Sequence, residues 1–93
     1  MNYKLYLPTD LNNVNPTNDN IDVCIELPNG KQYTFFVATP RNLQHLIQIG
    51  GTPYLEPGAP ILFVEKLTEE NIRLLIDALV QDPILLRIYG EDL

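Results

Sequence analysis

The sequence predicts a small α+β fold: a single two-layer domain in which a mixed sheet of about five strands packs against two helices, in the order β-β-β-α-β-α-β. Three observations lead to this prediction. A chain of 93 residues fits one domain and is too short for two, and 45% of its residues are hydrophobic, as a folded core requires. Two segments alternate between apolar and polar residues around a turn signal, and two others repeat with helical spacing.

The first strand is predicted at residues 3–7, where Tyr3, Leu5 and Leu7 alternate with Lys4 and Tyr6. Residues 8–20 follow, and they are rich in Asn, Asp and Pro. The side chains of Asn and Asp bond back to their own backbone and favour turns. We therefore expect 8–20 to be a polar, mobile loop within a single domain that spans residues 1–93.

A β-hairpin is the best-determined local feature. Two alternating segments, 21–27 and 31–37, flank the turn 28–30, whose sequence is Pro-Asn-Gly. A two-residue Asn-Gly turn would set apolar residues opposite polar ones. A three-residue turn instead pairs Val23 with Phe35 and gathers the apolar residues on one face, because a shift of one residue swaps the faces. We predict the three-residue turn.

The opposite face of this hairpin is polar apart from one aromatic ring. Phe36 lies there beside Thr34 and Asp22. An aromatic side chain among polar neighbours on an open sheet face can anchor a partner protein or a second copy of the chain. Single exposed apolar residues are also ordinary features of protein surfaces, so this interface remains a hypothesis.

Thr39-Pro40 is a helix start, with threonine as the cap and proline in the first turn. This first helix is expected to run to about Ile49 and to end at Gly50-Gly51. Its inner stripe is predicted to consist of Leu43, Leu46 and Ile47. A connection rich in Gly and Pro, residues 50–60, leads to a short apolar strand at 61–65.

A second helix is predicted from the cap Thr68 to the stop at Asp82-Pro83. Glu70 lies in its first turn, where the helix dipole favours negative charge. Leu74 and Asp77 lie away from its apolar stripe, and they join Glu70 as candidate contact residues on the solvent side. The apolar stripe is expected to comprise Ile72, Leu75, Ile76, Leu79 and Val80.

The last segment, 84–90, has an ambiguous pattern. Ile84, Leu86 and Ile88 alternate as in a strand, but Asp82 could also cap a short helix over the same residues. We favour the strand, which supplies the final β in the predicted order.

Charge and composition exclude several function classes. Twelve acidic residues against six basic ones give a net charge of −6 and an isoelectric point near 4.4. Such a surface repels nucleic acid and anionic membranes, so neither is an expected partner. One cysteine allows no internal disulfide, and no apolar run approaches the ~20 residues that cross a bilayer. We expect a cytoplasmic protein.

Catalytic and metal-binding chemistry has few residues to use. The chain contains no serine, and Cys24 and His45 are predicted on different elements, which argues against a thiolate–imidazole pair. One cysteine and one histidine cannot build a structural zinc site unaided. Residues 18–29 lack the glycine and glutamate of a calcium-binding loop. We expect no enzyme activity, cofactor or metal.

These observations favour a non-catalytic protein that acts by protein–protein interaction, including self-association through the outer face of the 21–38 hairpin. An alternative is a neutraliser of the immunity or antitoxin kind, in which the acidic second helix would contact a basic enzyme. A less favoured alternative is a small-ligand carrier or an enzyme with a pocket around Tyr54 or His45.

Overall fold

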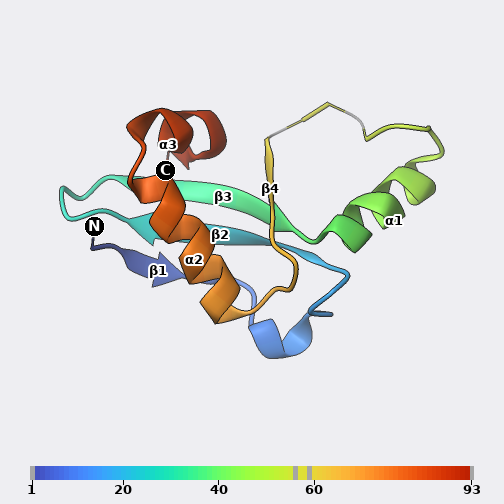
Figure 1. The fold of residues 1–93 in the computed structure, drawn as a ribbon, viewed down its shortest axis with the longest axis horizontal. Coiled ribbons are helices and arrows are strands. Elements are labelled where there is room, and N and C mark those ends of the chain that lie inside the picture. The colour runs from blue at the N-terminus through green and yellow to red at the C-terminus, as the bar shows by residue number, and fades with distance from the viewer. Residues whose placement is uncertain (1, 56, 59, 93) are drawn as a thin grey trace.

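The computed structural model describes residues 2–55, 57–58 and 60–92 and shows a small α+β domain (Figure 1). Glu56 and Ala59, in the predicted connection 50–60, lie outside the described residues. The strands β1 to β4 form a mixed sheet in that order, in which β4 runs parallel to β3 and the other neighbours are antiparallel. In chain order the elements are β1 (Lys4–Tyr6), the 3-10 helix η1 (Leu11–Asn13), β2 (Asn20–Glu26), β3 (Gln32–Ala38), α1 (Pro40–Gly50), β4 (Ile61–Phe63), α2 (Glu69–Val80), α3 (Pro83–Tyr89) and β5 (Glu91–Asp92).

The predicted hairpin register is confirmed. Val23 pairs with Phe35 and Ile25 with Tyr33 in the antiparallel ladder of β2 and β3. The three-residue turn is closed by the Gly30 N–H, which donates to the Leu27 carbonyl at 2.9 Å. Gly30 has a φ of 86°, a left-handed conformation that a residue with a Cβ adopts only with strain.

The hydrophobic core lies between the sheet and α2, which crosses in front of the strands in Figure 1. We call this side of the sheet the inner face. Tyr33 and Phe35 are buried there, as predicted. The helix α2 contributes the largest share of the covering layer, because four of its apolar side chains are buried: Ile72, Ile76, Leu79 and Val80.

The last predicted strand is wrong over most of its length, since residues 83–89 form the helix α3. The Asp82 side chain accepts hydrogen bonds from the N–H groups of Ile84 and Leu85, and Pro83 occupies the first turn. These local capping signals outweighed the alternation of Ile84, Leu86 and Ile88. The described residues therefore hold three α-helices, where two were predicted, and the final strand is reduced to the two-residue β5, which pairs with β3.

Gly90 lets the chain turn from α3 into β5 against the core. A Cβ built on Gly90 would lie 2.7 Å from the Leu86 carbonyl oxygen and from Tyr33 Cδ1. Such distances are below ordinary van der Waals contact, so this position needs glycine for space. The close approach seats β5 beside β3.

The helix α1 does not cover the sheet. It begins at its predicted cap, where Thr39 Oγ1 accepts a hydrogen bond from the Asn42 N–H at 3.3 Å, but it extends away beyond the end of β3 (Figure 1). Its predicted inner stripe, Leu43, Leu46 and Ile47, is only half-buried, and the one α1 residue that is buried is Asn42.

The polar loop 8–20 is joined to the rest of the molecule at several points. Leu11 and Val14 pack against the core from η1 and the residue after it. The Leu67 N–H donates to the Pro16 carbonyl at 2.8 Å, and the Thr39 N–H donates to the Asp19 carbonyl at 3.2 Å. The loop therefore connects β1, the α2 entry and the start of α1.

Candidate protein interface

The outer face of the sheet lies opposite the core. Because side chains alternate along a strand, residues next to buried core positions point to this side. Phe36 stands opposite Asp22 in β2 and beside Ile61 in β4. We define the outer face by these alternate positions on four strands: Lys4, Tyr6, Asp22, Cys24, Glu26, Gln32, Thr34, Phe36, Ile61 and Phe63.

The helix α2 packs against the inner face, and α1 extends past the end of the sheet (Figure 1). The end of α3 reaches the outer face only at Tyr89, which borders a hollow beside Phe36. The ten side chains named above remain partly or largely in contact with solvent, whereas Ala38, which pairs with Phe63 at the end of this face, is buried. Tyr6 is 49% exposed and Phe63 is 41% exposed, although both are large hydrophobic residues. An apolar surface of this kind on a sheet is typical of an interaction site.

Phe36 lies in a small hollow at the edge of this face. The hollow has a volume of about 150 Å³ and is lined by Asp22, Thr34, Pro60, Tyr89 and Glu91 as well as by Phe36 itself. The ring is half-buried, so it is neither sealed in the core nor fully in water. Two carboxylates border the hollow: Asp22 lies opposite Phe36, and Glu91 lies opposite Thr34 in the neighbouring strand.

The centre of the outer face carries small side chains. Cys24 Sγ and Thr34 Oγ1 are 3.5 Å apart across β2 and β3. Lys4 stands at the end of the face near the hairpin turn, where its ammonium lies 3.7 Å from the Glu26 carboxylate. The lysine side chain is nevertheless 71% exposed. The face therefore has an ion pair at the Lys4 end, the Asp22 carboxylate towards the other end, and Glu91 level with its centre.

The six residues proposed as contacts from the sequence fall on two separate surfaces. Phe36, Thr34 and Asp22 lie together on the outer face, as expected for neighbouring positions of one hairpin. Leu74, Glu70 and Asp77 are exposed on α2, on the side turned away from the core. The sheet and its core lie between the two groups, so they do not form one site.

Asp77 is tied to the N-terminal strand. The Tyr3 hydroxyl donates a hydrogen bond of 2.8 Å to Asp77 Oδ1 and a longer one of 3.3 Å to the Arg73 carbonyl. Burial raises the pKa of Tyr3, and the hydrogen bond to Asp77 raises it further. This contact links β1 to α2 and leaves Leu74 as the apolar residue of that surface, at 62% exposure.

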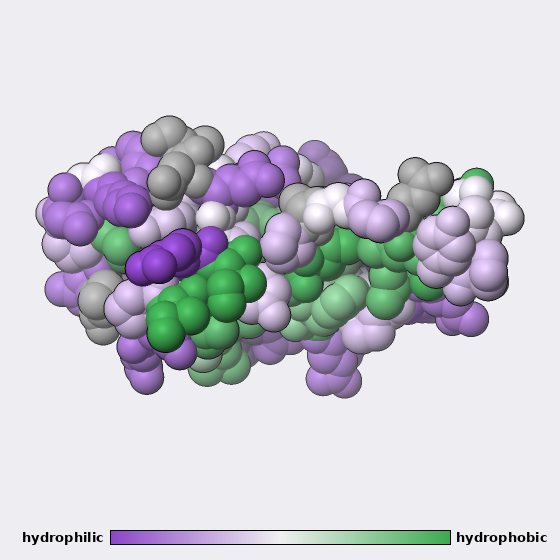
Figure 2. All heavy atoms as spheres, turned by 90° about the horizontal axis from the view of Figure 1, so that it is seen from above, coloured by the Kyte–Doolittle hydropathy of each residue, from purple (hydrophilic) through white to green (hydrophobic). Residues whose placement is uncertain are grey.

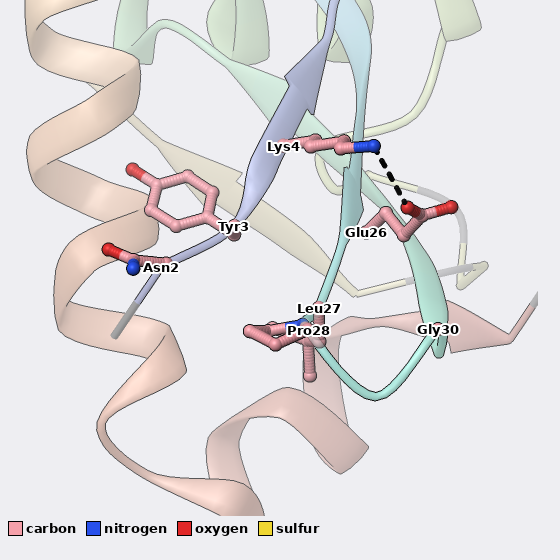
Figure 3. Close-up of a pocket in the computed structure, with 7 residues that line it drawn as sticks. All are labelled: Asn2, Tyr3, Lys4, Glu26, Leu27, Pro28 and Gly30. Atoms are coloured by element: carbon pink, nitrogen blue, oxygen red, sulfur yellow. Dashed lines mark ion pairs between the residues drawn. The ribbon is translucent and has the colours of Figure 1, made fainter.

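A further hollow of about 290 Å³ lies at the edge of the sheet near the hairpin turn. Figure 3 shows that Tyr3 and Lys4 point to opposite sides of β1, and that the Lys4–Glu26 ion pair closes one flank. Leu27 and Pro28 form the remaining apolar wall.

Cys24 and His45 lie on different elements, as predicted. Cys24 lies in the middle of β2, whereas His45 lies on α1 and borders a different, polar hollow with Arg41 and Gln44. Among the described residues, no group of three or more His, Cys, Asp or Glu side chains is placed to hold a metal ion. Nor is any described helix long and apolar enough to cross a membrane.

Sequence reasoning missed four members of the outer face: Lys4, Tyr6, Ile61 and Phe63. The alternation of the first strand puts Tyr6 on the side opposite Leu5. Because β1 pairs with β2, that side belongs to the same face of the sheet as Cys24. Ile61 and Phe63 could not be assigned a face, because a continuous apolar run gives no alternation. Their positions depend on the parallel pairing of β4 with β3.

Comparison with family models, curated proteins and solved structures finds no match to this chain.

Proposed function

We propose that this chain is a non-catalytic cytoplasmic protein that works by burying the outer face of its sheet against another protein. The single observation that supports this proposal is the exposure of Tyr6 and Phe63 beside the half-buried Phe36 on the outer face of the sheet. A free aromatic side chain presents about 150–250 Å² of surface, so Tyr6 and Phe63 each leave on the order of 100 Å² to be removed from water.

The physical gain from covering these groups is considerable. At about 25 cal/mol per Å² of apolar surface, two aromatic side chains at this exposure contribute roughly 5 kcal/mol before the costs of association. The small side chains of Cys24 and Thr34 in the centre allow a partner to approach closely. Buried aromatic anchors carry a large share of the binding energy at many protein interfaces.

The test is site-specific crosslinking in cells that express the full chain. A photoreactive phenylalanine analogue at position 36 should give a covalent protein adduct, because the partner covers this ring. The matched control carries the same analogue at position 74, which is also exposed and apolar but lies on α2. Adducts from position 74 and none from position 36 would contradict the proposal.

A second candidate function is favoured by the outer surface of α2. Leu74 is 62% exposed there, and Glu70 and Asp77 share the same surface. An apolar residue within an acidic surround suits a neutraliser of a basic enzyme, because opposite charge speeds the encounter. Crosslinking from position 74 to a basic protein, reduced by Glu70→Lys, would support this alternative over the first.

A further inference from the structure

Two carboxylates stand on opposite sides of the hollow beside Phe36. Asp22 lies on β2, to one side of β3, and pairs with Phe36. Glu91 lies on β5, to the other side of β3, and pairs with Thr34. Directly paired residues of an antiparallel sheet point to the same face. Both carboxylates therefore lie on the outer face, with Phe36 and Thr34 between them.

The spacing of Asp22 and Glu91 suits one cationic group. Their strands are two strand spacings apart, about 9.6 Å, and their partners on β3 are two residues apart, about 6.8 Å along the strand. The two Cα atoms are therefore about 12 Å apart. Such a gap holds a single cationic group that has a carboxylate oxygen at roughly 2.8 Å on each side.

The described part of the chain does not neutralise either carboxylate. The side chains of Asp22 and Glu91 form no hydrogen bond or ion pair with a described residue, in contrast to Glu26, which pairs with Lys4. No lysine or arginine is among the described residues that line the hollow. The net charge of −6 adds a long-range attraction for a basic partner.

The other walls of the hollow suit a flat group that is partly apolar. Phe36 and Tyr89 bring two aromatic side chains to it, and Pro60 adds an apolar wall. A volume of about 150 Å³ accommodates the end of one side chain, whereas pockets for whole small molecules measure roughly 300–1,000 Å³. The planar guanidinium of arginine stacks on aromatic rings and donates hydrogen bonds from its edges, whereas the lysine ammonium is compact and strongly hydrated.

We infer that the hollow beside Phe36 binds one arginine side chain of the partner protein, and that the Asp22 and Glu91 carboxylates accept hydrogen bonds from opposite edges of its guanidinium. The inference rests on the proposed function and specifies the chemistry of the partner. The exposed rings of Tyr6 and Phe63 supply apolar area elsewhere on the outer face, and the charged hollow fixes where the arginine binds.

The experiment titrates the full ¹⁵N-labelled chain with Nα-acetyl-arginine amide at constant ionic strength and follows the backbone amide signals by NMR. The signals of Thr34 and Phe36 should shift saturably, with a dissociation constant of about 1–20 mM, whereas that of Leu74 on α2 should not shift. Nα-acetyl-citrulline amide, which has a similar shape and no charge, should bind at least about tenfold more weakly.

Variants of the hollow should weaken binding of the arginine probe. Asp22→Asn and Glu91→Gln should each raise its dissociation constant about three- to tenfold, because each removes one charge and keeps the shape of the side chain. Phe36→Leu, which removes the ring and keeps an apolar side chain, should raise it about threefold. Glu70→Gln, the matched control, removes the same charge from an exposed residue of α2 and should change it by less than about twofold. The NMR spectrum of each variant shows that it folds.

The inference would be overturned by the absence of a saturable shift up to about 50 mM probe, or by citrulline or lysine probes that bind as tightly as the arginine probe. Wild-type affinity in any of the three hollow variants would also contradict it. Photocrosslinking from position 36 separates this inference from the proposed function. The protein adduct should fall at least about fivefold when Asp22→Asn and Glu91→Gln are combined. An adduct that survives both substitutions would leave the proposed function standing and remove the inference.

Discussion

The two longest helices begin in the same way and end up in different surroundings. In α1, the Thr39 hydroxyl oxygen accepts a hydrogen bond from the Asn42 N–H at 3.3 Å. In α2, the Thr68 hydroxyl oxygen accepts one from the Asn71 N–H at 3.1 Å. Each helix also has an apolar stripe at helical spacing. Yet α2 buries four apolar residues in the core, whereas α1 buries only its asparagine.

The length of the preceding connection explains this difference. One residue, Thr39, separates the end of β3 from the start of α1. Connections from strand to helix usually need two to six residues to fold the helix back onto the sheet. Five residues, 64–68, precede α2, and this helix does turn back over the inner face. Local signals therefore set where a helix begins, and the connection sets what it can cover.

Figure 2 shows the consequence at the surface. Hydrophobic surface gathers in one area on the α3 side of the molecule and in a second area between β4 and α1. Ile49, near the end of α1, is 67% exposed.

The largest expected effect compares the two apolar stripes directly. Ile76→Ala in α2 should lower the free energy of unfolding by about 3–4 kcal/mol, because Ile76 is fully buried and its removal leaves a cavity. Leu46→Ala in α1 should cost less than about 1 kcal/mol, because the side chain is already half in water. Urea unfolding followed by circular dichroism measures both. Equal losses would show that α1 packs as tightly as α2.

The next expected effect compares the asparagines. Asn42 Oδ1 accepts a hydrogen bond from Asn20 Nδ2 at 2.8 Å, and Asn42 Nδ2 donates to Asn18 Oδ1 at 3.3 Å. Asn42→Ala should lower the free energy of unfolding by about 1–3 kcal/mol, because it removes the Asn42 partner of the Asn18 and Asn20 side chains at a partly buried site. Asn71→Ala removes one bond, to the Lys66 carbonyl at 3.1 Å, and should cost about 0.5–1 kcal/mol.

Hydrogen exchange separates the two asparagine variants further. Asn42 joins α1 to Asn18 in the preceding loop and to Asn20 at the start of β2. Asn42→Ala should therefore speed exchange of the α1 amides while the amides in the rest of β2 and β3 stay protected. Asn71→Ala should leave the α1 amides unchanged. Uniformly faster exchange in Asn42→Ala would mean that α1 does not open as a separate unit.

The predictable part of the fold is the part that local rules determine. The hairpin register followed from one requirement, that Val23 and Phe35 share a buried face, and the threonine caps followed from local capping chemistry. The segment 84–90 was misassigned because its alternation fits a strand and its capping residue fits a helix. Seven residues are too few for either periodicity to decide.

The candidate site was predictable to the same extent. Phe36, Thr34 and Asp22 were grouped correctly because one hairpin carries all three. Leu74 was also a candidate contact residue. No local pattern in the sequence indicates which face of the sheet α2 covers, so its position relative to the hairpin residues could not be predicted. Phe63 joins the outer face through a parallel pairing with β3, which depends on residues far apart in the sequence.

The smallest expected effect concerns the bond that ties β1 to α2. Tyr3→Phe removes the hydroxyl that donates to Asp77 and should cost about 1 kcal/mol at neutral pH. The pKa of Tyr3 is raised in the folded state from an ordinary value of 10.0, by burial first and by Asp77 next, with Arg73 acting weakly in the opposite direction. The folded state therefore favours the protonated phenol.

This shift fixes the sign of the pH dependence. The stabilisation from Tyr3 is fully present below pH 10.0 and is lost as pH rises through the raised folded pKa. The difference in unfolding free energy between the wild type and Tyr3→Phe should therefore shrink when urea unfolding is repeated in steps above pH 10.0. A difference that grows with pH would mean that the Tyr3 phenolate, and not the phenol, is the form held against α2.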